Sequence, residues 1–335
     1  MSASARAEAP SAESLRTVFT ELPPSCVLYA PRNPDLVVVG TYYLDESATA
    51  LGKKKTGSLL LYQQIYSTDG ISDLRLLQTL PAEAVLDIKF SPHDPTLLGV
   101  AQSLGVLSFY RLNAEEAVFV LDSHHHVCDS SILVLALAFS PTSPEHLALT
   151  LSSGGVALFS LSAGKIVYQY NPHELEVWTC EFSSDGKTLY SGGDDSVFCA
   201  QSLEAETQLW RDRKTHQAGV TAILAREATN NTILTGSYDE WLRIFDSRTR
   251  RVVDDARLGG GVWRIHMRDT DSVLASCMHA GARIVALPGE GRPLSVVAKF
   301  EEHESMNYGS HIHGSRPNSV VSCSFYDKRL CIWSI

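Results

Sequence analysis

The fold of this chain is decided by the stretch Leu234-Thr-Gly-Ser-Tyr-Asp-Glu-Trp-Leu-Arg-Ile-Phe-Asp246. Small residues at 235–237 end one predicted strand, and a polar turn follows at Asp239 and Glu240. From Trp241 onward, successive side chains alternate between the two sides of an extended segment, as a half-buried strand requires. The stretch therefore predicts two antiparallel strands that are joined by a tight turn.

This strand pair resembles part of a WD repeat. It closes on Phe245-Asp246, an aromatic residue followed by aspartate, and Thr215-His216 stands upstream of Val220-Thr-Ala-Ile-Leu224, where such a repeat carries Gly-His. If the stretch belongs to one blade of a β-propeller, the rest of the chain should repeat it at intervals of roughly 40–50 residues.

The expected repetition runs through the sequence. Strand groups of the same plan, separated by turns rich in Gly, Ser and Asp, recur at intervals of 40 to 49 residues. A single period over the whole length indicates a repeat architecture. We therefore predict an all-β, seven-bladed WD-repeat propeller that forms one domain over residues 14–335. The third strands of its blades are expected at Tyr62, Tyr110, Phe159, Cys199, Phe245, Val285 and Trp333.

The two ends of the chain receive different predictions. Residues 1–13 are small and polar, which predicts a disordered tail without a secretory signal. Residues 15–22 can form one strand. Propellers often complete the last blade with a strand from the opposite terminus, because this covers an open sheet edge. We expect residues 15–22 to pair with the last blade.

Composition excludes several classes of protein. No apolar run approaches the roughly 18–20 residues that span a bilayer. A net charge of −10 argues against nucleic acid as a partner. The seven cysteines form no CxxC pair, which indicates reduced thiols in a cytoplasmic protein. The clusters His124-His-His126 and His311-x-His313 lack an obvious further ligand. We expect a cytoplasmic monomer without a cofactor or metal.

Binding residues are expected on the face that carries the loops before the first strand and between the second and third strands of each blade. The predicted strands place there a group rich in acidic, aromatic and histidine side chains. Two histidines of the group are interpreted as structural, His216 with Ser237 and Asp239, and His173 with Asp194. The other members are Glu174, Trp178, Asp195, Glu240, Trp263, Arg264, His279, His303, Ser305 and Tyr308.

Five motifs, in order along the chain, resemble one family. They are Gly192-Gly-Asp-Asp195, Gly236-Ser-Tyr-Asp-Glu240, Gly260-Gly-Val-Trp-Arg264, Cys277-Met-His279, and a segment that carries His303, Ser305 and Tyr308-Gly309. This set is similar to the WD-repeat diphthine methyl ester hydrolases of diphthamide synthesis, and it covers roughly residues 173–310. The seventh blade departs from the family at Ser310-His-Ile-His313. The resemblance implies hydrolysis of the methyl ester on the modified histidine of translation elongation factor 2.

Roles for individual residues follow as expectations from the resemblance. The substrate carries a trimethylammonium group, which aromatic faces and carboxylates hold well. Ester hydrolysis also needs an activated nucleophile and a group that stabilises the oxyanion. We expect His279 or His303 to act as the base, Ser305 as the nucleophile, and Arg264 or Tyr308 as the oxyanion donor. The expected cation-binding residues are Trp178, Trp263, Asp194, Asp195, Asp239 and Glu240.

Two other functions remain open at this stage. The first is a non-catalytic adaptor that brings elongation factor 2 to another enzyme, and the second is an unrelated WD scaffold, for example in membrane trafficking. Propellers often serve as scaffolds, so the fold by itself implies no activity. An adaptor needs an exposed recognition surface but no pair of histidine and hydroxyl groups on the binding face.

Overall fold

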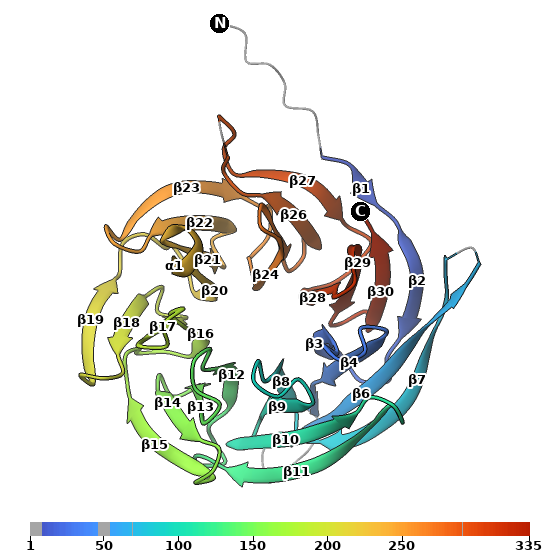
Figure 1. Ribbon diagram of the computed structural model, residues 1–335, viewed down its shortest axis with the longest axis horizontal. Coiled ribbons are helices and arrows are strands. Elements are labelled where there is room, and N and C mark those ends of the chain that lie inside the picture. The colour runs from blue at the N-terminus through green and yellow to red at the C-terminus, as the bar shows by residue number, and fades with distance from the viewer. Residues whose placement is uncertain (1–8, 46–53, 69, 290) are drawn as a thin grey trace, which may run out of the picture.

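The chain forms a closed ring of seven β-sheets around a central opening (Figure 1). A computed structural model describes residues 9–45, 54–68, 70–289 and 291–335. Within these ranges the elements are β-strands apart from one short helix, α1 (Glu227–Asn230). Among the described residues, no helix is long and apolar enough to cross a membrane. The predicted all-β, seven-bladed propeller is confirmed.

Each blade is built from antiparallel strands that follow one another in the chain, as the alternating sequence patterns require. Blade 1 contains β3 (Pro24–Tyr29), β4 (Leu36–Thr41), β5 (Tyr43–Asp45), β6 (Lys54–Ser67) and β7 (Gly70–Ala82). Blade 2 contains β8 (Val85–Phe90), β9 (Leu97–Gln102), β10 (Val106–Asn113) and β11 (Val118–His126). Blade 3 contains β12 (Val134–Phe139), β13 (His146–Leu151), β14 (Val156–Ser160) and β15 (Lys165–Tyr170).

The remaining blades follow the same plan. Blade 4 contains β16 (Val177–Phe182), β17 (Thr188–Gly193), β18 (Phe198–Ser202) and β19 (Thr207–Asp212). Blade 5 contains β20 (Val220–Arg226), β21 (Thr232–Ser237), β22 (Trp241–Asp246) and β23 (Arg251–Arg257). Blade 6 contains β24 (Arg264–Asp269), β25 (Ser272–Ser276), β26 (Ala282–Ala286) and β27 (Ser295–Phe300). Blade 7 contains β28 (Asn307–His313), β29 (Arg316–Ser324) and β30 (Arg329–Ser334).

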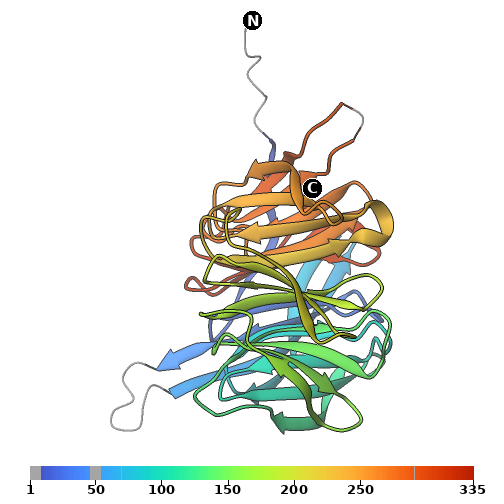
Figure 2. The same cartoon turned by 90° about the vertical axis from the view of Figure 1, so that its left-hand side faces the viewer.

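The predicted third strands are found in all seven blades. The seven residues at which the sequence predicted third strands, from Tyr62 to Trp333, lie in β6, β10, β14, β18, β22, β26 and β30. Each of these is the third long strand of its blade. In blade 1 the third strand is longer than the period predicts, because β6 also pairs with the short strand β5. Figure 2 shows these blue strands projecting from one face of the ring.

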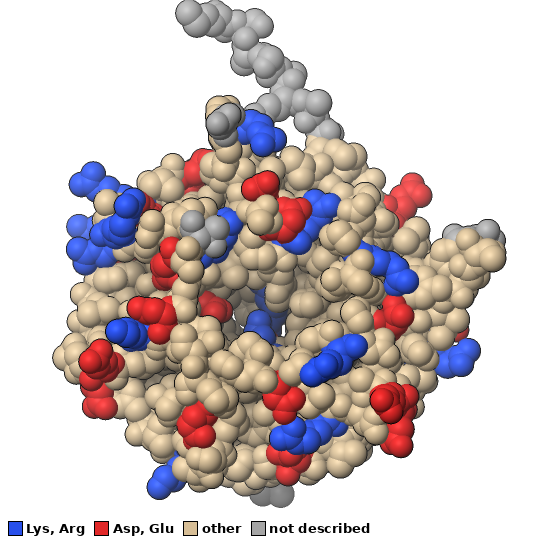
Figure 3. Space-filling view, in the orientation of Figure 1, with Lys and Arg blue, Asp and Glu red and all other residues tan. Residues whose placement is uncertain are grey.

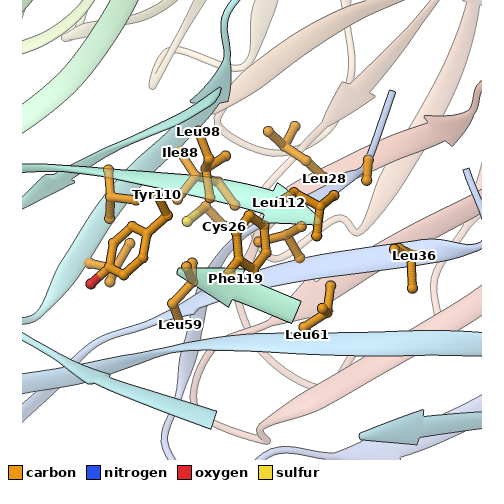
Figure 4. Close-up of a cluster of buried hydrophobic side chains, with 14 residues drawn as sticks. Cys26, Leu28, Leu36, Leu59, Leu61, Ile88, Leu98, Tyr110, Leu112 and Phe119 are labelled. Carbon is orange, nitrogen blue, oxygen red and sulfur yellow. The ribbon is translucent and has the colours of Figure 1, made fainter. Parts of the chain in front are cut away.

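The core lies between adjacent blades rather than inside one sheet. Figure 4 shows one such cluster, in which Leu28, Leu59 and Leu61 of blade 1 meet Ile88 and Leu98 of blade 2. All five side chains are buried. Each blade therefore buries both faces of its sheet against its neighbours, and the ring must close before the first and last blades are covered.

Two strands from the N-terminus close the ring. Strand β2 (Ser14–Phe19) pairs antiparallel with β30 and supplies the outer strand of blade 7. This confirms the expected closure, although the strand begins and ends earlier than the predicted residues 15–22. Strand β1 (Ser11–Ala12) pairs in parallel with β27 of blade 6. The predicted disordered tail of residues 1–13 therefore needs correction at β1, and its residues 1–8 lie outside the described residues.

Buried histidines tie the loops to the blades. Nε2 of His303 lies 2.8 Å from Ser322 Oγ, and the indole of Trp333 donates to the same hydroxyl at 3.0 Å. His216 Nε2 lies 2.9 Å from Thr235 Oγ1, so its partner is Thr235 and not the predicted Ser237.

Blade 4 uses a third histidine in the same way. His173 Nε2 lies 2.9 Å from Ser191 Oγ, and its Nδ1 lies 2.9 Å from Asp195 Oδ1. The predicted partner Asp194 is one residue away from the observed one. The structural role predicted for His173 and His216 is therefore correct, but the partner was wrong in each case.

Ring closure leads to a prediction about truncation. Removal of residues 1–10 should leave the melting temperature nearly unchanged, since β2 remains paired. Removal of residues 1–19 should expose the edge of β30 and cause aggregation. It should also lower the melting temperature by several degrees, since each kcal/mol lost from the free energy of unfolding lowers it by about 2–4 °C. Differential scanning calorimetry and size-exclusion chromatography measure both effects. A soluble, equally stable protein without residues 1–19 would contradict closure through β2.

The buried histidines lead to a prediction about pH. Burial lowers the pKa of His303 and of His216 to about 4, from about 6.5 in an unfolded chain. The unfolded state therefore binds more protons between these values, so this stabilisation is complete above pH 6.5 and is lost as pH falls toward 4. The melting temperature should fall over this window, and His303→Asn should reduce the slope. An equal slope in the wild type and the variant would contradict the assignment.

Candidate functional site

One residue near the start of the first strand of every blade points into the central opening. In six blades the strand pairing shifts by one residue at this position, which is the mark of a β-bulge. A bulge leaves the extra residue outside the ladder and turns its side chain in a new direction. The seven residues, one from each blade in order, are Ser25, Leu86, Leu135, Trp178, Thr221, Trp263 and Tyr308.

Close contact between neighbouring blades holds this ring of residues in place. A Cβ on Gly192 would lie 2.6 Å from Cγ1 of Val220, and a Cβ on Gly236 would lie 2.5 Å from Cγ1 of Val262. Only glycine therefore allows the second strand of one blade to approach the first strand of the next. Val220 and Val262 immediately precede Thr221 and Trp263 in the chain. The contact therefore also fixes the positions of these two cavity-lining residues.

The ring of residues surrounds a cavity of about 340 Å³ on the predicted binding face. Aromatic side chains form much of its wall, and Trp263 lies in the middle of them. Ring centroids of Trp178, Tyr238 and Tyr308 lie 5.4, 5.6 and 5.0 Å from the ring of Trp263. Other aromatic residues that line the cavity are Tyr42, Phe325 and Tyr326.

Two charged residues reach the cavity in the described part of the chain, Glu176 and Arg264. Arg264 is held by Asp87, whose Oδ1 lies 2.9 Å from Arg264 Nη1, and it donates from Nη2 to the Leu86 carbonyl at 3.2 Å. The carboxylate of Glu176 has no hydrogen bond or ion pair with the described residues. An aromatic wall beside an unpaired carboxylate favours a cationic ligand.

Four of the predicted site residues line this cavity. Trp178 and Trp263, which were expected to bind a cation, and Arg264 and Tyr308, which were expected to act as oxyanion donors, all reach it. Asp194 lies behind the wall, where its Oδ1 accepts a hydrogen bond of 2.9 Å from the indole nitrogen of Trp178. Asp194 therefore orients an aromatic ring and is not itself a lining residue.

Three predicted carboxylates are engaged elsewhere. Burial acts to raise the pKa of Asp239, but hydrogen bonds from Arg243 and two backbone amides outweigh it and the pKa is lowered. Asp195 has a lowered pKa for the same kind of reason, with His173 as its partner. Glu240 pairs with Arg257 at 2.8 Å. These carboxylates do not line the cavity, and their role as substrate-binding residues stays a prediction.

The predicted pair of a histidine and Ser305 is not formed. His303 is buried and contacts Ser322, as described above. Oγ of Ser305 accepts a hydrogen bond of 3.0 Å from the backbone amide of Tyr326. His279 is exposed in the turn after β25. None of the three lines the cavity, and the position of His303 corrects its predicted role as a base.

The sequence interpretation missed several lining residues. Glu176, Tyr238 and the pair Phe325-Tyr326 were not predicted, and neither was Asp87 as the partner of Arg264. A signal for Glu176 was present, because it directly precedes Val177-Trp178 at the start of a first strand. The signal for Tyr238 was its place between Ser237 and Asp239, in the loop after a second strand.

Comparisons with known proteins agree with this architecture. The family model described as WD domain, G-beta repeat matches residues 164–199. A chain of the crystal structure of the mitotic checkpoint complex superposes with a TM-score of 0.74 at 15% sequence identity, covering 100% of this chain and 95% of that one. This similarity concerns the fold alone.

Sequence relatives are more specific. The diphthine methyltransferase of Schizosaccharomyces pombe is 37% identical over 328 residues, which cover 95% of this chain and 96% of the relative. The diphthine methyltransferase of Saccharomyces cerevisiae is 30% identical over 398 residues, with 96% and 98% covered. Both matches extend over nearly the full length of both proteins. The chain therefore belongs to the diphthine methyltransferase family.

Proposed function

We propose that this protein is a carboxyl methyl ester hydrolase that removes the methyl group from methylated diphthine on translation elongation factor 2. The product carboxylate would then be available for amidation to diphthamide. One observation carries the proposal: in a member of the diphthine methyltransferase family, the Glu176 carboxylate has no partner among the described residues and lies beside the aromatic wall of Trp178 and Trp263. This combination suits a substrate that carries a fixed positive charge.

The shape of the site fits a side chain presented by another protein. The cavity opens on the face that carries the loops, and Tyr326 on its rim is 72% exposed. A modified histidine on a protein loop could enter while the rest of the partner remains outside. In this arrangement the trimethylammonium group packs against the faces of Trp178 and Trp263, and Glu176 supplies the opposite charge.

Arg264 and Tyr308 are the groups that we assign to the ester. In hydrolysis, a water oxygen bonds to the carbonyl carbon, the bond to the methoxy oxygen breaks, and methanol leaves with a proton. Negative charge develops on the carbonyl oxygen, so fixed donors lower the barrier. Arg264 is held by Asp87 and presents guanidinium N–H donors, and the Tyr308 hydroxyl is a second donor at the same wall.

We assign the nucleophile to water rather than to Ser305. The Ser305 hydroxyl lies under the turn of Tyr326, and no imidazole contacts it among the described residues. A water molecule in the cavity needs no such pair. We propose that this reaction takes place in the cytoplasm, where unpaired thiols such as the seven described cysteines are usual.

The name of the relatives suggests methyl transfer in the opposite direction, and a non-catalytic adaptor is the other alternative. One experiment separates the three functions. The purified protein is incubated with elongation factor 2 that carries methylated diphthine and, in a parallel reaction, with the unmethylated form together with a sulfonium methyl donor. Released methanol and protein-bound methyl groups are measured in both reactions. Methanol release supports the hydrolase. A gain of methyl groups would support transfer, and tight binding with neither change would support the adaptor.

The unpaired carboxylate leads to a prediction about affinity. Glu176→Gln should raise KM for the methylated substrate by about tenfold, because a partly buried cation loses its counter-charge while the cavity keeps its shape. kcat should change much less. Glu174→Gln is the matched control, since Glu174 is exposed and pairs only with Arg213 at the surface. Equal KM values in Glu176→Gln and the wild type would contradict cation binding at this position.

The assignment of the nucleophile leads to a second prediction. Arg264→Lys keeps a positive charge, but a lysine cannot bind Asp87 and donate to the ester oxygen in the geometry of a guanidinium. kcat should therefore fall by roughly 100-fold. Ser305→Ala and His279→Ala should keep most of the activity if water attacks directly. The rates of variants are compared only where their melting temperatures equal that of the wild type. A 100-fold loss in both Ser305→Ala and His279→Ala, with the fold intact, would instead support the serine mechanism expected from the sequence.

A further inference from the structure

We propose that the groove between blades 4 and 5 binds a short acidic segment of a partner protein. The groove has a volume of about 580 Å³ and lies away from the central cavity. Strand β19 and the loop that follows it form one side, and Phe245 and Arg250 of blade 5 form the other. The two sites share no lining residue.

The groove has a marked excess of positive charge. Its lining contains Arg211, Arg213, Lys214 and Arg250, with Asp212 as the single acidic residue among the described ones. Both oxygens of Asp212 are already occupied by Thr215 and by the amide of Lys214. Asp212 therefore shapes the loop and offsets one of the four positive charges, which leaves a net excess of three in the described lining.

These cations have little to bind within the protein. Among the described residues Arg213 pairs with Glu174 alone, and both side chains are more than half exposed, so the pair contributes little. Among the described residues, the side chains of Lys214 and Arg250 have no hydrogen bond or ion pair. Arg211 Nη2 lies 3.5 Å from Asp195 Oδ2, and the buried nitrogens Nε and Nη2 of Arg211 lack a hydrogen-bond acceptor in the described structure.

A comparable groove between blades 2 and 3 shows that this charge excess is not a general feature of the fold. That groove has a volume of about 420 Å³, and its arginine, Arg111, lies 2.7 Å from both Asp94 and Asp122. It is therefore neutralised by the protein itself. The described lining of the groove between blades 4 and 5 has one carboxylate, Asp212, for four cations, which leaves further negative charge to be supplied by a ligand.

The charge pattern favours an acidic peptide over nucleic acid. The whole chain carries −10, so a long polyanion would be repelled outside the groove, whereas a short segment meets only the local positive charge. Figure 3 shows Lys and Arg atoms gathered at the rim near β19 and the β22–β23 turn. Trp210 packs edge-on against Phe198 at 4.8 Å, so its ring is occupied and does not provide a stacking platform for bases.

This inference is independent of the proposed function, because it concerns a different surface and involves binding without a catalysed reaction. The full-length protein is titrated into a fluorescein-labelled oligoglutamate peptide, and binding is followed by fluorescence anisotropy at low and high salt. Binding that weakens with salt is expected. The variant Arg213→Glu with Lys214→Glu should weaken it by at least about tenfold, the effect of roughly 1.4 kcal/mol.

The matched control is Lys165→Glu with Lys187→Glu. Both lysines are exposed outside the groove, and the change in net charge is the same as in the test variant. The control should bind the peptide as the wild type does, and calorimetry confirms that both variants are folded. Equal loss in the two variants, no peptide binding by the wild type, or binding of oligouridylate in place of the peptide would each overturn the proposal.

Discussion

The close approach of neighbouring blades is the constraint on which the rest of this structure depends. At Gly192 and Gly236 a second strand touches the valine that begins the next blade, and any side chain there would push the blades apart. The contact sets the spacing of the ring. It also fixes the valines that directly precede Thr221 and Trp263, so that a packing requirement determines where the cavity wall can be.

Because one residue per blade, at a β-bulge in six of the seven, lines the opening, the chemistry of the cavity is set by very few positions. Blades 4, 6 and 7 place Trp178, Trp263 and Tyr308 there, whereas the other blades place smaller or aliphatic side chains. The aromatic residues are therefore gathered on one part of the wall. A charged side chain can therefore bind on one side of the cavity, although the fold itself is nearly symmetric.

Satisfied polar groups separate structural residues from candidates for function. Buried polar atoms normally have hydrogen-bond partners, and His173, Asp195 and Asp239 follow this rule. Their interactions explain their sequence pattern without any ligand. The Glu176 carboxylate has no such partner in the described part of the chain, although Glu176 directly precedes β16. An unpaired carboxylate at an aromatic wall is more informative about ligand binding than the larger acidic group expected from the sequence.

The sequence by itself determined the period of the strands and the seven third strands, because alternation and turn residues are local properties. The pairing of the first strand with the last blade was expected from the need to cover an open sheet edge. It also indicated Trp178 and Trp263, since both follow a valine at the start of a first strand. Only the tertiary structure decided between Asp194 and Asp195, and between Ser305 and Ser322 as the neighbour of His303. A shift of one residue at a bulge or turn reverses the direction of a side chain, and hydrogen bonds between distant strands then select its partner. Neither effect leaves a trace in the local sequence pattern.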